Sequence, residues 1–295
     1  MTALPAGQIP GIYHRRVGDT LVTVISDGYL DGSLDVLLNV APELLRELLT
    51  ESFRPTVGRR TSVNTFVVRA PGRAPVVIDA GSGNYLAATA GIQQANLAAA
   101  GIDAAAVGSV LLTHMHPDHS GGLAAPDTGA LLFPNAELVA HEKELPYWSD
   151  DAEMGKASER VKKVFFQQAR DQTAPYRGRL RTFRDGEVLP GITAIPCPGH
   201  TPGHTSFLIH SGAESLLIWG DTVHVPEVQI PRPEIGISFD ADTVEAAATR
   251  RRVFDMAASD RLAVAGMHLH FPGVGHIARR GDGYALLPEP WAFTI

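Results

Sequence analysis

The sequence predicts a mixed α/β protein in which two sheets pack together and helices cover their outer faces. Apolar, β-branched segments of strand length recur along the chain, hairpins occur in both halves, and helical segments lie between them. This order fits neither a regular series of alternating strands and helices nor an all-β protein. Because no repeat and no long polar linker interrupts the 295 residues, we expect one domain over residues 1–295.

Short apolar runs bounded by Gly, Pro, Asn or Asp predict the strands. In chain order they cover residues 20–26, 64–69, 75–79, 110–113, 137–141, 191–196, 206–210, 215–219 and 262–265. Pro71-Gly72 and Gly212 each separate two neighbouring runs, so we expect antiparallel hairpins at these two turns.

Four further segments have helical patterns. Pro42 begins a short helix with leucines at 44, 45, 48 and 49, which form one apolar stripe. Residues 84–100 are rich in Ala and Leu and end at Gly101, a favourable C-terminal cap. Residues 150–170 carry apolar side chains on one helical face. A further helix is expected over residues 242–259, with Asp240 or Asp242 as the capping acid near its N-terminus.

Composition restricts the class of protein. Hydrophobic residues make up 44% of the chain, which excludes disorder as its main state. A net charge of -7 repels phosphate backbones, so we expect no nucleic-acid partner. Cys197 is the single cysteine, which excludes an internal disulfide and a four-cysteine zinc site. No apolar run approaches the roughly 20 residues that cross a bilayer, and no signal-peptide pattern is visible; we expect no membrane partner and a cytoplasmic location.

The strongest signal is the segment Thr113-His114-Met115-His116-Pro117-Asp118-His119, which directly follows a predicted strand. Three imidazoles and one carboxylate lie within six residues, and all four are side chains of types that can bind a metal ion. In an extended chain His114 and His116 point the same way. A helical turn beginning at Pro117 would direct Asp118 and His119 toward a different point, so one segment can serve two adjacent ions.

Candidate ligands also follow three later strands. They stand in the segments Pro-Gly-His-Thr-Pro-Gly-His at 198–204, Gly-Asp at 220–221 and Met-His-Leu-His-Phe-Pro-Gly at 267–273. In the first of these, His204 suits a structural role better than His200 does. One shared site explains these positions better than independent turns do. Two ions about 3.5–4 Å apart can share a bridging hydroxide, so the pattern favours a dinuclear hydrolase. No Ser-His-Asp arrangement or phosphate-binding glycine loop competes with it.

These motifs resemble the metallo-β-lactamase superfamily, to which the Asp79-Ala80-Gly81 turn is also similar. The chain is similar in particular to the methyl parathion hydrolase-like branch. That similarity rests on Ser26-Asp27-Gly28, Phe-Pro-Asn-Ala at 133–136, His224-Val225, Val228-Gln229 and Phe-Pro-Gly-Val-Gly-His at 271–276. The resemblance therefore covers almost the whole chain.

The resemblance implies a four-layer αββα sandwich with a metal site at one edge between the sheets. It implies two divalent ions, with zinc expected and manganese, cobalt or iron as alternatives. One ion would be held by His114, His116 and His200, and the other by Asp118, His119 and His268, with Asp221 as the bridge. His268 is preferred to His270 because it occupies the ligand's place before Phe-Pro-Gly. Asp79 would orient the site without binding metal, and His276 would be structural.

The branch contains lactonases, arylesterases and organophosphate hydrolases. We expect a homodimeric hydrolase that opens a small lactone or cleaves an ester through a metal-bridging hydroxide, with Asp118 and Asp221 as its catalytic carboxylates. Phosphotriester cleavage is the alternative, and a β-lactamase or thiolester hydrolase is less favoured. The superfamily also has a redox branch, in which a carboxylate commonly stands in the place of His116, so the imidazole argues against a redox function. A non-catalytic metal-binding module is a further class of function. Candidate pocket residues are Trp148, Phe165, Phe166 and His224, although the three aromatic residues fit core positions equally well.

Overall fold

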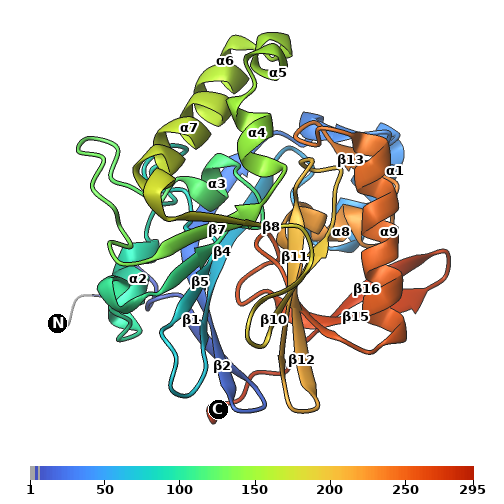
Figure 1. Cartoon of the computed structure of the whole chain (residues 1–295). Coiled ribbons are helices and arrows are strands. Elements are labelled where there is room, and N and C mark those ends of the chain that lie inside the picture. Colours follow the sequence, from blue (N-terminus) through green and yellow to red (C-terminus); the bar gives the residue numbers. More distant parts are fainter. Residues whose placement is uncertain (1–3, 6) are drawn as a thin grey trace.

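The computed structural model describes residues 4–5 and 7–295. Two seven-stranded sheets pack face to face, and helices lie on their outer sides (Figure 1). This is the αββα arrangement that the sequence predicts. Among the described residues, no helix combines the length and the hydropathy that spanning a membrane requires.

The first sheet has the strand order β1-β2-β4-β5-β6-β7-β8. Its strands are β1 (Ile12–Val17), β2 (Thr20–Gly32), β4 (Arg59–Arg69), β5 (Val76–Ile78), β6 (Ser109–Leu111), β7 (Glu137–His141) and β8 (Leu180–Phe183). The pairs from β1 to β5 are antiparallel, whereas β5, β6, β7 and β8 run parallel to one another. The carboxyl ends of the parallel strands therefore meet at one edge of the sheet.

The second sheet has the order β16-β15-β14-β12-β11-β10-β9. Its strands are β9 (Gly186–Leu189), β10 (Ile192–Pro196), β11 (Thr205–Ser211), β12 (Glu214–Ile218), β14 (Ala263–Ala265), β15 (Val274–Arg280) and β16 (Gly283–Pro288). β12 and β14 are parallel neighbours and both run toward the edge where the parallel strands of the first sheet end. A small sheet pairs β3 (Leu37–Leu38) with β13 (Gly236–Ile237).

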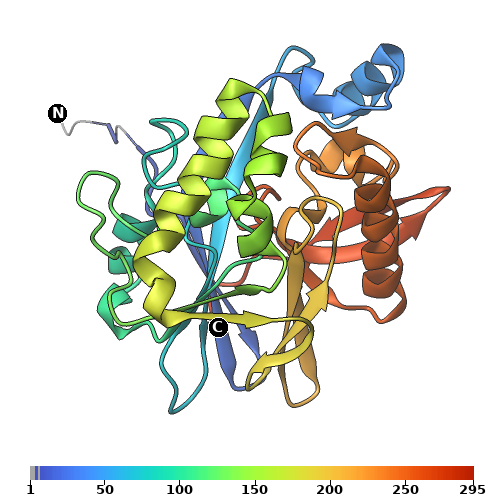
Figure 2. The same ribbon diagram turned by 45° about the horizontal axis from the view of Figure 1, so that its top comes forward.

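Helices cover both sheets. The helical segments between residues 144 and 173 lie over the first sheet, and α9 lies against the second (Figure 2). The α-helices are α1 (Pro42–Glu51), α2 (Gln93–Ala99), α3 (Pro117–Ser120), α4 (Glu144–Ser149), α5 (Asp151–Lys156), α6 (Glu159–Val161), α7 (Gln168–Thr173), α8 (Pro226–Gln229) and α9 (Thr243–Ser259). Short helical turns are η1 (Leu34–Val36), η2 (Ala104–Ala106), the π-helical η3 (Lys162–Gln167), η4 (Ala174–Arg179) and η5 (Gly220–Thr222).

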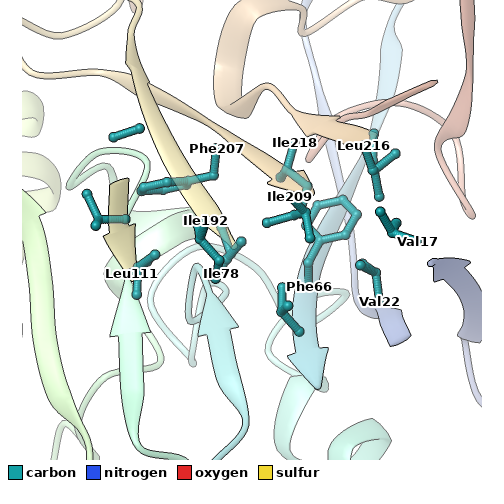
Figure 3. Packing of buried hydrophobic residues seen from close by; sticks show 14 of the residues in the cluster. Val17, Val22, Phe66, Ile78, Leu111, Ile192, Phe207, Ile209, Leu216 and Ile218 are labelled. Atoms are coloured by element: carbon teal, nitrogen blue, oxygen red, sulfur yellow. The ribbon is translucent and has the colours of Figure 1, made fainter. Parts of the chain in front are cut away.

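The main core lies between the two sheets. Phe66 and Ile78 from the first sheet meet Phe207 and Ile218 from the second, and all four side chains are fully buried (Figure 3). Separate apolar clusters fill the space between each sheet and its helices. The two sheets are thus fixed against each other, and the loops at their shared edge start from rigid strand ends.

Two predicted helices differ from the structure. Only 93–99 of the expected 84–100 is helical, because the preceding backbone bonds to β2 instead: Tyr29 N–H donates to the Thr89 carbonyl, and Ile92 N–H to that of Asp27. The expected helix over 150–170 is divided, because α5 ends at Lys156 and the Ser158 hydroxyl caps a new helix by accepting from Val161 N–H.

The strand predicted over 20–26 continues to Gly32 through a bulge between Ser26 and Gly28. Gly28 has a φ of +107°, and a Cβ there would lie 2.1 Å from the Thr89 carbonyl oxygen. The outer strands, among them β1, β8 and β16, are not predicted from the sequence. Their alternation with polar residues is irregular, and β1 reads Ile-Tyr-His-Arg-Arg-Val.

We predict that Phe207→Ala lowers the free energy of unfolding by about 3–5 kcal/mol, since it leaves a cavity between the sheets. Phe293→Ala is the matched control because that side chain is 85% exposed, and its effect should stay within about 0.5 kcal/mol. Urea unfolding followed by circular dichroism measures both. Equal losses in the two variants would contradict the inter-sheet core described here.

Candidate metal centre

Two candidate ligand pairs come from the end of β6. His114 and His116 stand in the extended segment after the strand, and both are buried. Pro117 begins α3, because the fixed φ of proline suits a first helical position. The single turn of α3 carries Asp118 and His119. The chain therefore changes direction at Pro117, as the sequence predicts. The two pairs face neighbouring points.

The other candidate ligands come from the second sheet. His200 lies in the loop after β10, Asp221 lies in η5 after β12, and His268 follows β14. All three side chains are buried. The loops meet the β6 segment at the shared edge of the sheets, and α3, which ends this segment, lies in the upper half of Figure 1.

His204 fixes the backbone of Asp221. The Asp221 N–H donates to His204 Nε2 at 2.9 Å, while His204 Nδ1 donates to the Cys197 carbonyl at 2.8 Å. Burial lowers the pKa of His204 to about 3, so its ring is neutral. Gly220 has a φ of +61°, and a Cβ there would lie 2.3 Å from His204 Nε2. His204 thus supports the site from behind, in agreement with the structural role that the sequence favours.

The candidate ligands form two main groups, and a third set overlaps both. The first group contains His114, His116, His200 and Asp221, the second contains Asp118, His119 and His268, and the overlapping set contains Asp221, His224 and His268. Asp221 Oδ2 lies 3.7 Å from His114 Nε2 and 3.4 Å from His200 Nε2. Its Oδ1 lies 3.1 Å from His119 Nε2, and Oδ2 lies 3.1 Å from His268 Nε2. The Asp221 carboxylate therefore contacts both groups.

The donor set fits divalent cations. His114 Nε2, His119 Nε2 and Asp221 Oδ1 are buried and have no hydrogen-bond partner within the described residues. Buried polar atoms without partners are rare and call for a ligand. Burial alone would raise the pKa of Asp221, but the surrounding imidazoles hold it well below its usual value. An ionised carboxylate among nitrogen donors is the mixed set that zinc accepts.

Three oxygens orient the imidazoles from outside. Asp79 Oδ2 lies 2.6 Å from His119 Nδ1, and Asp240 Oδ1 lies 2.8 Å from His200 Nδ1. The Ser62 carbonyl lies 2.8 Å from His268 Nδ1. Such contacts keep the outer nitrogen protonated and leave the inner one as an acceptor. The sequence indicates Asp79 as an orienting residue, whereas it suggests Asp240 only as a helix cap; Asp242 is the cap of α9.

Glu144 joins the two loops that carry the first group. Its buried carboxylate accepts from Met115 N–H at 3.0 Å, between His114 and His116. It also accepts from the Thr201 hydroxyl and from Gly203 N–H, which follow His200 in the same loop. Burial raises the pKa of the Glu144 carboxyl, while its donors act to lower it. No motif in the sequence singles out this residue.

The predicted pocket residues occupy different environments. His224 Nε2 lies 3.0 Å from Asp221 Oδ2, and its side chain also lines a cavity of about 990 Å³. Trp148 and Phe166 are buried in the core between the first sheet and its helices. Phe165 is half-buried and packs against His116 with a ring-centroid distance of 4.9 Å. The spacing Asp-x-x-His at 221–224 is the one sequence signal for the contact between His224 and Asp221.

Two further histidines lie apart from these groups. His270 Nε2 lies 2.6 Å from Glu227 Oε1, and His270 lines the same cavity. His276 is exposed, and its Nδ1 lies 3.1 Å from the Leu262 carbonyl oxygen. Of the two histidines in the 267–273 segment, His268 is the one that faces Asp221.

Comparison with known proteins gives a family match. Residues 58–268 match the family described as the metallo-beta-lactamase superfamily. The chain is similar to a solved structure described as hydrolase AbOPH in the beta lactamase superfamily, with 30% identity and a TM-score of 0.91 over 97% of this chain and 100% of that one. Its fold is also similar to AidC, a dizinc quorum-quenching lactonase, with 24% identity and a TM-score of 0.90 over 96% and 99% of the two chains.

Curated relatives match over shorter stretches. The uncharacterized protein YobT of Bacillus subtilis (strain 168) is 34% identical over 112 residues, which is 38% of this chain and 44% of YobT. The chain spans less than half the length of the curated relatives it matches.

We predict that Glu144→Gln destabilises the protein by about 3–5 kcal/mol, because an amide NH₂ would face buried donors in place of a carboxylate oxygen. Urea unfolding of the chelator-treated protein isolates this effect from metal binding. Glu142→Gln is the control, since Glu142 pairs with Arg184 at the surface and its loss should cost less than about 1 kcal/mol. A Glu144→Gln protein as stable as the control variant would refute the connecting role of this carboxylate.

Proposed function

The chain belongs to the metallo-beta-lactamase superfamily, and from this membership and the site geometry we propose a dinuclear metal-dependent hydrolase that opens a small lactone or cleaves an ester. The observation that carries the proposal is the Asp221 carboxylate, whose Oδ1 faces His119 while Oδ2 faces His200 and His268. A carboxylate in contact with two ligand groups is suited to bridging two ions. The resemblance to the methyl parathion hydrolase-like branch supports the same substrate class.

We propose that each ligand group holds one ion. His114, His116 and His200 would hold the first, Asp118, His119 and His268 would hold the second, and Asp221 would bind both. Zinc suits these nitrogen and oxygen donors. When bound, two such ions lower the pKa of water and polarise a substrate carbonyl, which supplies both the nucleophile and stabilisation of the developing oxyanion.

The chain's own residues set the geometry for this chemistry. Asp79, Asp240 and the Ser62 carbonyl fix the ring orientation of three ligands, so the inner nitrogens converge. His204 and Gly220 fix Asp221, on which the spacing of the two groups depends. His224 adjoins Asp221 and the cavity, and we propose that it contacts the substrate. The dimeric assembly and the cytoplasmic location stay predictions, as does substrate contact by Trp148, Phe165 and Phe166.

Metal content tests the ligand assignment. We expect elemental analysis to find two ions per chain, and His268→Ala to lose one ion and most activity. His270→Ala should keep both, because its ring pairs with Glu227. Asp221→Ala should be the most impaired, since a shift of about 1 Å can cost on the order of 100-fold in rate. Metal loss in His270→Ala but not in His268→Ala would invert the assignment.

Substrate preference tests the proposed reaction. We expect lactones or aryl esters to have a higher kcat/KM than β-lactams and thiolesters, with only weak turnover of a paraoxon-type phosphotriester. Chelator-treated protein should be inactive and should recover when zinc is restored. If penicillins are the best substrates, the proposal is wrong. If the phosphotriester is the best substrate, the alternative function, phosphotriester hydrolysis at the same site, replaces it.

A further inference from the structure

Arg59 lies beside the candidate metal centre at the first position of β4. Three residues further along this strand, the Ser62 carbonyl accepts from His268. Arg59 and His224 line the same cavity of about 990 Å³. The strand therefore carries a guanidinium into the cavity that reaches the metal centre at His224.

Among the residues that the structure describes, no carboxylate forms an ion pair with Arg59. One of its terminal N–H groups donates to the Thr61 hydroxyl, and its buried Nε has no hydrogen-bond partner within the described residues. Its neighbours differ: Arg54 Nε lies 2.5 Å from Glu227 Oε1, and Arg60 Nε lies 2.8 Å from Asp31 Oδ1. Three arginines and two carboxylates line this cavity, so the unbalanced charge is that of Arg59.

The surroundings of Arg59 keep this charge available. The Phe239 ring lies against one face of its guanidinium, with its centroid 5.7 Å from Cζ, and such stacking does not use the N–H groups of the fork. Burial lowers the pKa of Arg59 and the charge of Asp118 raises it, yet an arginine stays protonated near neutral pH. If Asp118 holds an ion, as proposed above, its charge is not available to Arg59. Because Arg59 is half-buried and its charge has no ion-pair partner in the described part of the chain, an anionic ligand would stabilise it.

We propose that Arg59 binds a carboxylate carried by the substrate, and that the preferred substrates are esters or lactones with an apolar body and a carboxylate away from the scissile bond. This inference rests on the proposed hydrolase function. The guanidinium fork matches a carboxylate in a two-bond geometry. Apolar side chains supply much of the remaining cavity wall, including Ile9, Val57, Ile92 and Phe271.

The test compares two esters that differ in charge but not in shape. They are the mono-4-nitrophenyl ester of glutarate and 4-nitrophenyl 5-methylhexanoate, in which two methyl groups replace the two carboxylate oxygens. We expect wild type to favour the glutarate ester in kcat/KM. Arg59→Met should lower kcat/KM for that ester by at least about tenfold, mainly through KM, and should change the neutral ester by less than twofold.

Controls separate recognition from structure. Arg184→Met should change neither ester, because Arg184 pairs with Glu142 at the surface and does not line this cavity. Arg59→Lys keeps the charge but loses the fork, so it should weaken only the glutarate ester; this variant decides the question if Arg59→Met does not fold. All variants should retain the wild-type metal content. Equal losses for both esters, or loss of metal, would overturn the assignment.

A binding measurement keeps this test independent of catalysis. If wild type hydrolyses neither ester, the hydrolase proposal fails, and Arg59 is then judged by calorimetric titration with glutarate. Binding to wild type that weakens at least about tenfold in Arg59→Met supports the carboxylate site. Absence of glutarate binding to wild type, or equal binding to both proteins, refutes it.

Discussion

Convergence of buried imidazoles on the Asp221 carboxylate is the constraint on which the rest of the site depends. His114, His119, His200 and His268 all place a ring nitrogen within 3.7 Å of this side chain. So many acceptors crowd together stably only when cations or protons lie between them. The fold meets this requirement by ending strands of two sheets at one shared edge, where the inter-sheet core holds them rigid.

A surrounding layer of hydrogen bonds turns this crowding into a defined geometry. Asp79 and Asp240 orient individual rings, whereas Glu144 ties together the two loops that carry the first ligand group. The cavity adjoins the cluster at His224. In the hydrolase proposed above, the ligands of the ions would stay fixed while Arg59 would select the substrate in the cavity.

The sequence predicts that the candidate ligands of the 113–119 segment form two pairs, because local geometry determines their directions; the full ligand set rests on the family resemblance and stays a prediction. The change of direction at Pro117 follows from the alternation of an extended chain and from the fixed φ of proline, and the structure has both. The sequence does not predict the roles of Glu144 and Asp240, because these roles come from contacts between loops distant in sequence. The same limit explains why the helix expected over 84–100 begins only at residue 93. The backbone at residues 89 and 92 forms hydrogen bonds with β2. The break in the helix expected over 150–170 could be predicted from the sequence, because serine is a favoured N-cap residue and Ser158 caps α6.

Anomalous diffraction at the zinc edge, from crystals grown with zinc, tests the central claim most directly. If Asp221 bridges two ions, we expect two strong anomalous-difference peaks about 3.5–4 Å apart, one on each side of the Asp221 carboxylate. The first should lie among His114, His116 and His200, and the second among Asp118, His119 and His268. A single peak under saturating zinc, or two peaks that both lie away from Asp221, would contradict the bridging role of this residue.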